Sequence, residues 1–132
     1  MSAYAQEEIF IPLGMNSTFF NPSKWSHRCA PTTDTPNYRN KLIRCEVHDP
    51  TAWILGGVSG NAGVFTNYQD LKKFMTMMLQ KGLYQDENGN YQRMFKNETV
   101  ELFTTAPQDL PYNNSRALGW DTIPSGYPNV CG

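Results

Sequence analysis

The chain has 132 residues, the length of one ordinary domain, and its contents of 39% hydrophobic, 13% aromatic and 17% charged residues exclude a disordered segment. Eleven basic and twelve acidic residues give a net charge of -1 without charge runs, so nothing indicates a nucleic-acid partner or an anionic membrane surface. The apolar runs are far shorter than the roughly 20 residues that span a bilayer, and the acidic N-terminal residues do not form a signal peptide. We therefore expect a folded domain without nucleic-acid partner, membrane span or export signal in these residues.

The first part of the chain is predicted to combine a helix end with a long irregular segment. Residues 3–10 mix apolar and polar side chains, and Pro12 ends this helix at or before residue 11. Gly14 can adopt the positive φ that turns the chain away. Residues 16–49 are rich in Pro, Asn, Ser and Thr and have no period of 2 or 3.6, so we expect a long loop with one short strand at residues 42–47.

A glycine-rich segment follows at residues 56–63, which contain four glycines separated by small side chains. Glycine tolerates positive φ and lets another group approach the backbone closely, so we expect such an approach here. The spacing fits neither the dinucleotide-binding pattern G-x-G-x-x-G nor the P-loop, which ends in Gly-Lys-Ser or Gly-Lys-Thr. The segment is therefore not predicted to bind phosphate.

The strongest helix signal begins at Asn67, a residue type favoured at the N-cap. Asp70 occupies the third helical position, where its carboxylate can return a hydrogen bond to the cap and meet the positive end of the helix dipole. The helix is expected to run to about residue 81, with Gly82 at the C′ position. Its apolar side chains recur at helical spacing and are predicted to pack in the core as one stripe of Leu71, Phe74, Met75, Met78 and Leu79.

Two further elements are predicted after this helix. Residues 86–90 contain Asn-Gly and indicate a tight turn or small hairpin. Asn97 is expected to cap a second helix at residues 98–104, whose Val100 and Phe103 face inward.

Residues 116–123 alternate loosely between apolar and polar side chains and indicate the beginning of a strand. Helices, long loops and short strands together predict an α+β fold.

The three cysteines do not determine whether the chain belongs to a reducing or an oxidising compartment. Cys29, Cys45 and Cys131 cannot all pair within one molecule, and free thiols are the favoured state. A disulfide between Cys29 and Cys45 is the alternative in an oxidising compartment. These two cysteines with His27 and His48 also match the ligand types of a tetrahedral zinc site, but their spacing fits no standard zinc finger.

Four polar residues in the middle of the chain are candidates for lining a substrate site: His48, Asp49, Ser59 and Asn61. Imidazole titrates near neutrality and a carboxylate can fix its tautomer, yet adjacent side chains rarely converge, so a hydrogen bond that braces the loop is the commoner role. Ser59 lies in a glycine-rich loop, but Asn61 occupies the last glycine position of the G-x-S-x-G nucleophile motif. No residue of this chain is therefore predicted to be catalytic.

Six sequence blocks extend over nearly the whole chain. They are IFIPLGMNST at residues 9–18, VHDPTA at 47–52, GGVSGNAGVFT at 56–66, DLKKF at 70–74, ETVEL at 98–102 and ALGW at 117–120. In this order the blocks resemble the serine hydrolases of the beta-lactamase and penicillin-binding-protein type, on the class C side, and coincidence does not explain all six. Asn61 stands where that family usually has histidine.

The resemblance also identifies what the sequence lacks. Family members need a nucleophilic Ser in Ser-x-x-Lys, a Tyr-x-Asn motif and a Lys-Thr-Gly or His-x-Gly strand, and the first and last are absent here. Tyr-x-Asn occurs at residues 38–40, 112–114 and 127–129, none of them in the family position upstream of the PLGM block. The resemblance therefore implies that residues 1–132 are the central part of a beta-lactamase-related domain, incomplete at both ends. They would contribute mostly the helical region, with long loops and the start of a sheet strand.

For function, the resemblance implies a parent enzyme in which Lys and Tyr activate a Ser that attacks an amide or ester carbonyl, and water then releases the acyl-enzyme. The expected substrates are small molecules or peptides: D-alanyl peptides, beta-lactams or simple esters. The family needs no metal or other cofactor, and an extracytoplasmic location of the parent stays open. The alternative is a noncatalytic remnant or binding module that holds peptide or sugar with aromatic residues such as Trp25, Trp53 and Trp120.

Overall fold

The computed structural model of the chain describes residues 1–22, 28–33, 39–107 and 116–122. Within these residues, helices alternate with three two-stranded antiparallel sheets, which pair β1 with β4, β2 with β3 and β5 with β6. This mixture confirms the predicted α+β class. The elements are α1 (Ser2–Ala5), the π-helical turn η1 (Gln6–Phe10), β1 (Phe19–Phe20), β2 (Pro31–Thr33), β3 (Ile43–Arg44), α2 (Pro50–Ile54), β4 (Val64–Phe65), α3 (Tyr68–Leu79), β5 (Leu83–Gln85), β6 (Tyr91–Arg93) and α4 (Asn97–Thr104).

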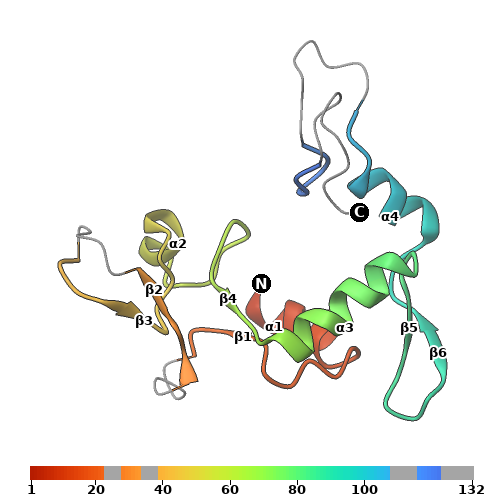
Figure 1. Cartoon of the computed structure of the whole chain (residues 1–132), viewed down its shortest axis with the longest axis horizontal. Coiled ribbons are helices and arrows are strands. Elements are labelled where there is room, and N and C mark those ends of the chain that lie inside the picture. The colour runs from red at the N-terminus through yellow and green to blue at the C-terminus, as the bar shows by residue number, and fades with distance from the viewer. Residues whose placement is uncertain (23–27, 34–38, 108–115, 123–132) are drawn as a thin grey trace, which may run out of the picture.

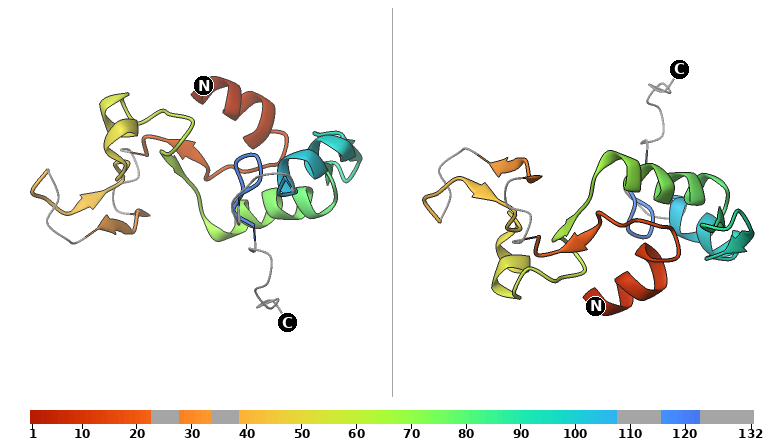
Figure 2. Two further views of the ribbon diagram at one scale, coloured as in Figure 1. Left: turned by 90° about the horizontal axis from the view of Figure 1, so that it is seen from above. Right: turned by 90° about the horizontal axis from the view of Figure 1, so that it is seen from below.

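The described elements form two groups. The β2–β3 hairpin and α2 lie at one end of the molecule, whereas α1, α3, α4 and the β5–β6 hairpin lie at the other (Figure 1). The β1–β4 pair lies between the two groups, as the views from above and below also show (Figure 2). Residues far apart in the sequence therefore meet where β4 leads into α3.

The N-terminal helix ends where proline and glycine predict. The π-helical turn η1 ends at Phe10, and its C-cap Ile11 stands directly before Pro12. Gly14 then takes φ +63°, which turns the chain away from the helix, as predicted. Phe10 and Leu13 are buried by this turn and form the main core with Met15 and Met77.

The long segment of residues 16–49 is more regular than expected. The predicted strand at residues 42–47 is present as the shorter β3, whereas β1 and β2 had no period in the sequence. Each of these strands has only two or three residues, which is too few to give a pattern of alternation. Ile43 is completely buried within this region.

Helix α3 begins at the predicted cap and ends earlier than predicted. The Asn67 side chain accepts a hydrogen bond from the Asp70 amide at 2.8 Å, as expected of an N-cap. The last helical residue is Leu79, and Lys81, not Gly82, occupies the C′ position with φ +55°. The amide of Gly82 donates to the Met77 carbonyl at 2.9 Å, the bond of a Schellman motif.

The buried face of α3 differs from the predicted stripe. Met77 is completely buried, and Phe74 and Met78 pack against the same cluster. Leu71 is 46%, Met75 39% and Leu79 79% exposed, so the prediction that these three residues pack in the core is wrong. Residues 70, 74 and 77 share one helix face by the i, i+4, i+7 rule, and this face meets the N-terminal turn. The sequence contains two apolar faces here, and spacing alone does not say which one is covered.

The elements after α3 match the prediction in part. Residues 86–90 form the turn of the predicted β5–β6 hairpin. Asn97 is the first residue of α4 and Lys96 is its N-cap, without a side-chain cap, so the predicted capping role of Asn97 is wrong. Val100 is buried as expected, whereas Phe103 is 45% exposed.

In place of the strand predicted at residues 116–123, residues 116–122 form a tight turn. It is closed by a single bridge between Arg116 and Asp121 and by a hydrogen bond from the Ala117 amide to the Trp120 carbonyl. Residue 123 lies outside the described residues. Within the described residues, no helix has the length and apolar character needed to cross a membrane.

Candidate functional site

Asp49, Ser59 and Asn61 form one hydrogen-bonded network. Asp49 Oδ1 accepts from the Ala52 amide at 2.7 Å, which makes Asp49 the N-cap of α2, with Pro50 at the first helical position. The same oxygen accepts from Asn61 Nδ2 at 3.0 Å, and Ser59 Oγ lies 2.6 Å from Asn61 Oδ1, to which it donates. The network closes the loop between α2 and β4. Its geometry agrees with the bracing role that the sequence favours for Asp49.

These hydrogen bonds also determine the charge of the network. The pKa of Asp49 is lowered from its usual 3.8, first by the hydrogen bond from the Ala52 amide and then by that from Asn61. A carboxyl group with a lowered pKa accepts protons poorly, so Asp49 is suited to hold backbone and not to act as a general base. Ser59 bonds to an amide oxygen and not to a basic nitrogen, so the bond does not activate it as a nucleophile.

His48 is separate from this network and lines a cavity of about 630 Å³. Val47, the disulfide-bonded Cys29 and the β4 residue Phe65 contribute apolar wall, and Thr66 and Asn67 add polar groups. We call this the His48 cavity. Its other lining residues are Asn16, Ser17, Phe19, Pro22, Arg28, Ala30, Pro31, Thr32, Gly63 and Val64.

Arg39 fixes the backbone that carries His48. Its side chain is 5% exposed, and its Nη2 donates to the carbonyls of Val47 at 2.6 Å and of His48 at 3.0 Å. The guanidinium also lies 5.2 Å from the ring centroid of Trp53, a cation–π distance. The sequence does not identify Arg39 as a positioning residue. Its partners are backbone oxygens, which every residue has, so these bonds leave no motif in the sequence.

The glycine-rich segment approaches other groups closely, as predicted. Gly57 has φ +81°, and a Cβ there would collide with the Asn21 side chain. Gly63 has φ +113°, and a Cβ there would collide with the Gly57 carbonyl. Only glycine fits at these two positions, where the loop folds onto itself and onto the end of β1.

Asp70 joins the wall of the His48 cavity to α3. Its carboxylate is buried and accepts from the Ser17 amide at 2.7 Å and from Thr18 Oγ1 at 2.9 Å. Thr18 Oγ1 also lies 2.8 Å from Thr66 Oγ1. The structure thus uses the Asp70 carboxylate for a bond between distant segments, and the predicted bond back to the Asn67 cap is not the one formed.

Cys29 and Cys45 form a disulfide, with their Cα atoms 5.4 Å apart. The prediction of free thiols is therefore wrong for these two residues, and the same bond removes both sulfurs from the proposed zinc ligand set. Within the described residues, no group of three or more His, Cys, Asp or Glu side chains could hold a metal ion. His27 and Cys131 lie outside the described residues.

Comparison with solved structures relates this fold to one class of proteins. An octameric penicillin-binding protein homologue from Pyrococcus abyssi superimposes with a TM-score of 0.53 over 89% of this chain and 24% of that chain. The sequence identity is 17%, so this likeness concerns the fold alone. The α+β arrangement is therefore that of part of a penicillin-binding-protein-like fold.

Sequence comparison identifies the family. A family model described as Beta-lactamase matches residues 1–128, and the chain belongs to this family. A putative D-alanyl-D-alanine carboxypeptidase of Escherichia coli K12 is 33% identical over 134 aligned positions, and an N-acetylmuramyl-L-alanine amidase of Bacillus subtilis is 31% identical. These alignments cover 91% of this chain and 29% of each relative. The resemblance inferred from the six sequence blocks is confirmed.

Proposed function

We propose that these 132 residues supply the substrate-facing middle part of a beta-lactamase-related serine hydrolase, which forms and hydrolyses an acyl-enzyme from an amide or ester. The observation that carries the proposal is the His48 cavity, whose wall includes Val47, His48 and Gly63 from the VHD and GGVSGNAG blocks. Asp49, Asn61 and Arg39 brace the adjoining backbone. The chain spans 29% of the length of the relatives, and Ser-x-x-Lys is absent from its sequence. The nucleophile would therefore come from residues outside this chain.

In this role His48 faces the substrate, whereas Asp49, Asn61 and Arg39 position the loop. His48 is exposed on the cavity wall and its backbone is fixed, so its imidazole can donate to or accept from a substrate at little entropic cost. The relatives are named as carboxypeptidases of D-alanyl-D-alanine and an amidase. D-Alanyl peptides are accordingly the first substrate class to test.

Acylation of the chain by itself provides the first test. A fluorescent penicillin should leave no covalent label on the isolated chain, because the Ser and Lys that form an acyl-enzyme are missing. Intact-protein mass spectrometry measures the label. Stoichiometric acylation of any serine would contradict the proposal.

A chimera provides the positive test. This chain replaces the matching segment of the Escherichia coli relative, which retains its own Ser-x-x-Lys, and acylation should be recovered. In that chimera His48→Ala should slow acylation by about 5- to 30-fold, the effect of losing one hydrogen bond of about 1–2 kcal/mol. Gln92→Ala, on the distant β5–β6 hairpin, is the matched control and should leave the rate unchanged. A folded chimera without acylation would refute the role of this chain.

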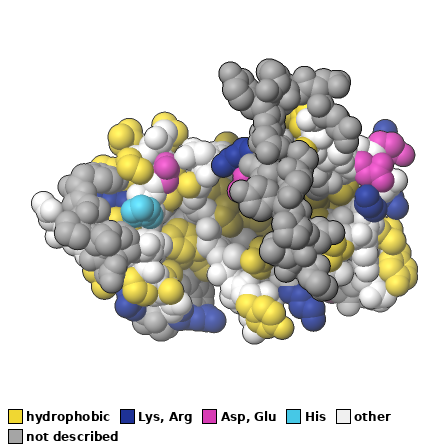
Figure 3. All heavy atoms as spheres, turned by 45° about the horizontal axis from the view of Figure 1, so that its top comes forward, with side chains coloured by type: hydrophobic (Ala, Val, Ile, Leu, Met, Phe, Trp, Pro, Cys, Tyr) yellow, Lys and Arg dark blue, Asp and Glu magenta, His cyan; other side chains and the backbone are white. Residues whose placement is uncertain are grey.

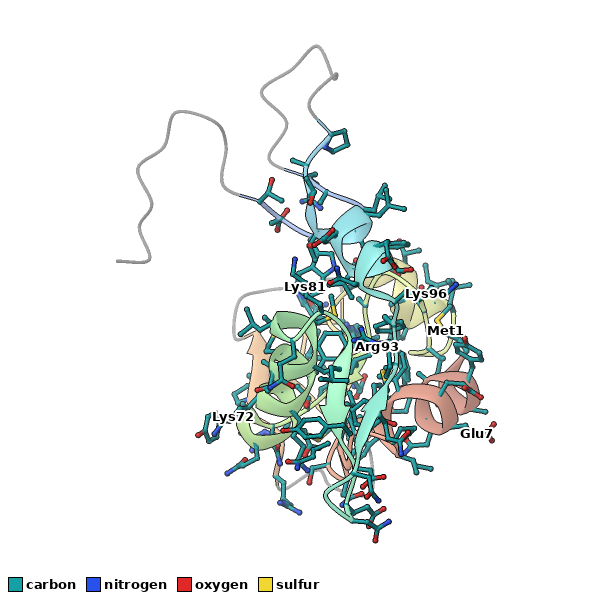
Figure 4. The ribbon with its side chains drawn as sticks, turned by 90° about the vertical axis from the view of Figure 1, so that its right-hand side faces the viewer. Met1, Glu7, Lys72, Lys81, Arg93 and Lys96 are labelled. Carbon is teal, nitrogen blue, oxygen red and sulfur yellow. A yellow bond between two sulfur atoms is a disulfide. The ribbon has the colours of Figure 1, made fainter. Side chains whose placement is uncertain are left out.

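A second function, saccharide binding without catalysis, is favoured by a different surface. Three tyrosines, Tyr68, Tyr84 and Tyr91, line a groove of about 660 Å³ between α3 and the β5–β6 hairpin. Buried Leu13 and Met77 also line it, and Lys72 extends outward from α3 at its side (Figure 4). Tyrosine rings offer an apolar face for stacking and a hydroxyl for hydrogen bonding, as a sugar ring requires. Trp53 and Trp120, in contrast, line neither this groove nor the His48 cavity.

Binding of an oligosaccharide distinguishes this second function. A tetramer of N-acetylglucosamine is titrated into the chain and followed by chemical shifts. Tyr91→Ala should abolish binding, whereas Tyr4→Ala should not, since both side chains are 68% exposed but only Tyr91 lines the groove. Equal loss in both variants, or no binding by the unmodified chain, would refute the second function.

A further inference from the structure

The Cys29–Cys45 disulfide joins two segments of the His48 cavity. Cys29 is part of the cavity wall, and Cys45 lies two residues before Val47, which is also part of it. Cys45 is buried, and the cysteines are 16 residues apart in sequence. The bond therefore connects the wall formed by residues 28–32 to the segment that carries His48.

Few other bonds hold the two sides of this hairpin together in the described residues. The ladder between β2 and β3 pairs Pro31 with Arg44 and Thr33 with Ile43, with an irregularity between these pairs. Proline has no amide hydrogen, so Pro31 cannot donate to the ladder. A side-chain bond from Thr32 Oγ1 to the Ile43 carbonyl, 3.1 Å long, adds one contact. So short and irregular a ladder is weak without a crosslink.

The His48 side of the hairpin is anchored independently of the disulfide. It is tied to Arg39 through the carbonyls of Val47 and His48 and through the Glu46 carboxylate at 3.3 Å. Among the described residues, the weak ladder and the disulfide join β2 to this anchored segment. Loss of the disulfide should thus separate the wall of residues 28–32 from the anchored segment of residues 46–48.

The backbone of Cys45 adds a second reason for this sensitivity. Cys45 has φ +54°, a left-handed conformation that is strained for a residue with a side chain. Such a conformation persists only where surrounding bonds hold it. With the sulfur no longer tied to Cys29, the backbone at Cys45 can return to a favourable φ, and the hairpin loses its register.

We propose that the Cys29–Cys45 disulfide is the positioning element of the His48 cavity and makes the cavity redox-sensitive: oxidised, the hairpin forms the wall, and reduced, the wall opens. A dithiol reductant would transfer two electrons and two protons to the disulfide, leaving two cysteine thiols and an oxidised reductant. Opening of the wall does not depend on catalysis. Its consequence for substrate rests on the proposed function.

Hydrogen exchange of the full chain tests the wall directly. A Cys131→Ser background leaves Cys29 and Cys45 as the only cysteines, and exchange is compared with and without dithiothreitol. Reduction should speed exchange at residues 28–33 by at least about tenfold, since the crosslink no longer ties this wall to the anchored segment. Exchange in the β5–β6 hairpin is the internal control and should not change. Equal exchange of the wall in both states would overturn the proposal.

A double variant makes the result independent of the reductant. Cys29→Ser with Cys45→Ser in the same background should reproduce the fast exchange without dithiothreitol, and reductant should then have no effect. If the variant exchanges as slowly as the oxidised chain, the disulfide does not position the wall. An effect of dithiothreitol that persists in this variant would equally overturn the proposal.

The chimera described above separates failure of this proposal from failure of the proposed function. If reduction opens the wall and the oxidised chimera is acylated, reduction should slow acylation at least about fivefold, the lower limit expected for loss of one positioned substrate contact. Acylation that does not change on reduction would overturn the substrate consequence. If the chimera is inactive in both states but the wall opens on reduction, the proposed function fails and the redox-sensitive wall stands.

Discussion

Asp49 receives hydrogen bonds from the first turn of α2 and from Asn61 through the same carboxylate oxygen. One side chain thereby starts a helix and closes the loop that follows it. The adjacent His48 lines the cavity and is not a hydrogen-bond partner in this network. Two neighbours in the sequence therefore have different roles, one holding the loop and one available to a ligand.

The protonation of Asp49 gives a prediction with a definite sign. Its pKa is lowered from 3.8 in the folded chain, chiefly by the Ala52 amide, so the folded state binds fewer protons than the unfolded state. The resulting stabilisation is fully present above the unfolded pKa and is lost as pH falls through the lower, folded pKa. An NMR titration of the Ala52 amide and the Asn61 side-chain amide should therefore have its midpoint below pH 3.8.

The matched controls separate Asp49 from its neighbour Glu46, whose pKa is also lowered, first by a hydrogen bond from Lys41. Glu46→Gln should leave the titration of the Ala52 amide in place, and Asp49→Asn should remove it. A midpoint at or above pH 3.8 would mean that the carboxylate does not cap α2 in solution.

At the scale of single elements, the start of α3 depends on a local side-chain cap. Asn67→Ala removes the side-chain bond to the Asp70 amide and should destabilise the first turn by about 1 kcal/mol. This corresponds to about fivefold faster amide exchange in that turn, a local measurement that needs no global unfolding transition. Gln69→Ala, an exposed change in the same turn, is the control. Unchanged exchange in Asn67→Ala would place the start of the helix elsewhere.

Comparison of α2 and α3 explains which helix starts can be predicted. The start of α3 follows from Asn67 and its apolar period, both of which are local. Helix α2 has an equally local signal, Asp49 at the N-cap and Pro50 after it, but its five residues are too few to show a helical period, so the sequence does not predict it. Whether a helix can be predicted here depends more on its length than on the quality of its N-cap.

The covered face of α3 and the candidate site needed information beyond local sequence. Asp70 bonds to Thr18, 52 residues away, and Arg39 bonds to backbone oxygens. Neither interaction can be recognised from the spacing of residues in the sequence. His48 and Asn61 could be named because the resemblance and their polar types pointed to them. Their separation into a cavity residue and a bracing residue needed the fold.

At the scale of the whole molecule, a large apolar surface is exposed. Leu71, Met75 and Leu79 form an uncovered face of α3, and Leu102 and Phe103 on α4 are also exposed. The space-filling view shows hydrophobic side chains in several patches over the described elements (Figure 3). Trp120 stacks on Phe74 at 6.4 Å but leaves this face of α3 open. Exposed apolar area of this kind marks a surface that a protein normally covers or an aggregation hazard.

We therefore expect the isolated chain to fold poorly on its own, although its length suffices for one domain. The uncovered face of α3 should give low solubility or a loosely packed state with a broad urea transition. Covering that face in the chimera should rescue solubility. Analytical ultracentrifugation and urea unfolding measure both properties.

Matched substitutions on opposite faces of α3 assign the effect to the exposed surface. Leu79→Gln, on the open face, should raise solubility, because it replaces exposed apolar area with an amide. Met77→Gln places the same amide in the buried core, where it finds no solvent, and should lower solubility further. If the unmodified chain is instead a soluble monomer with a sharp two-state transition and a urea m-value of about 1–3 kcal/mol/M, its exposed face needs no cover and the expectation is wrong.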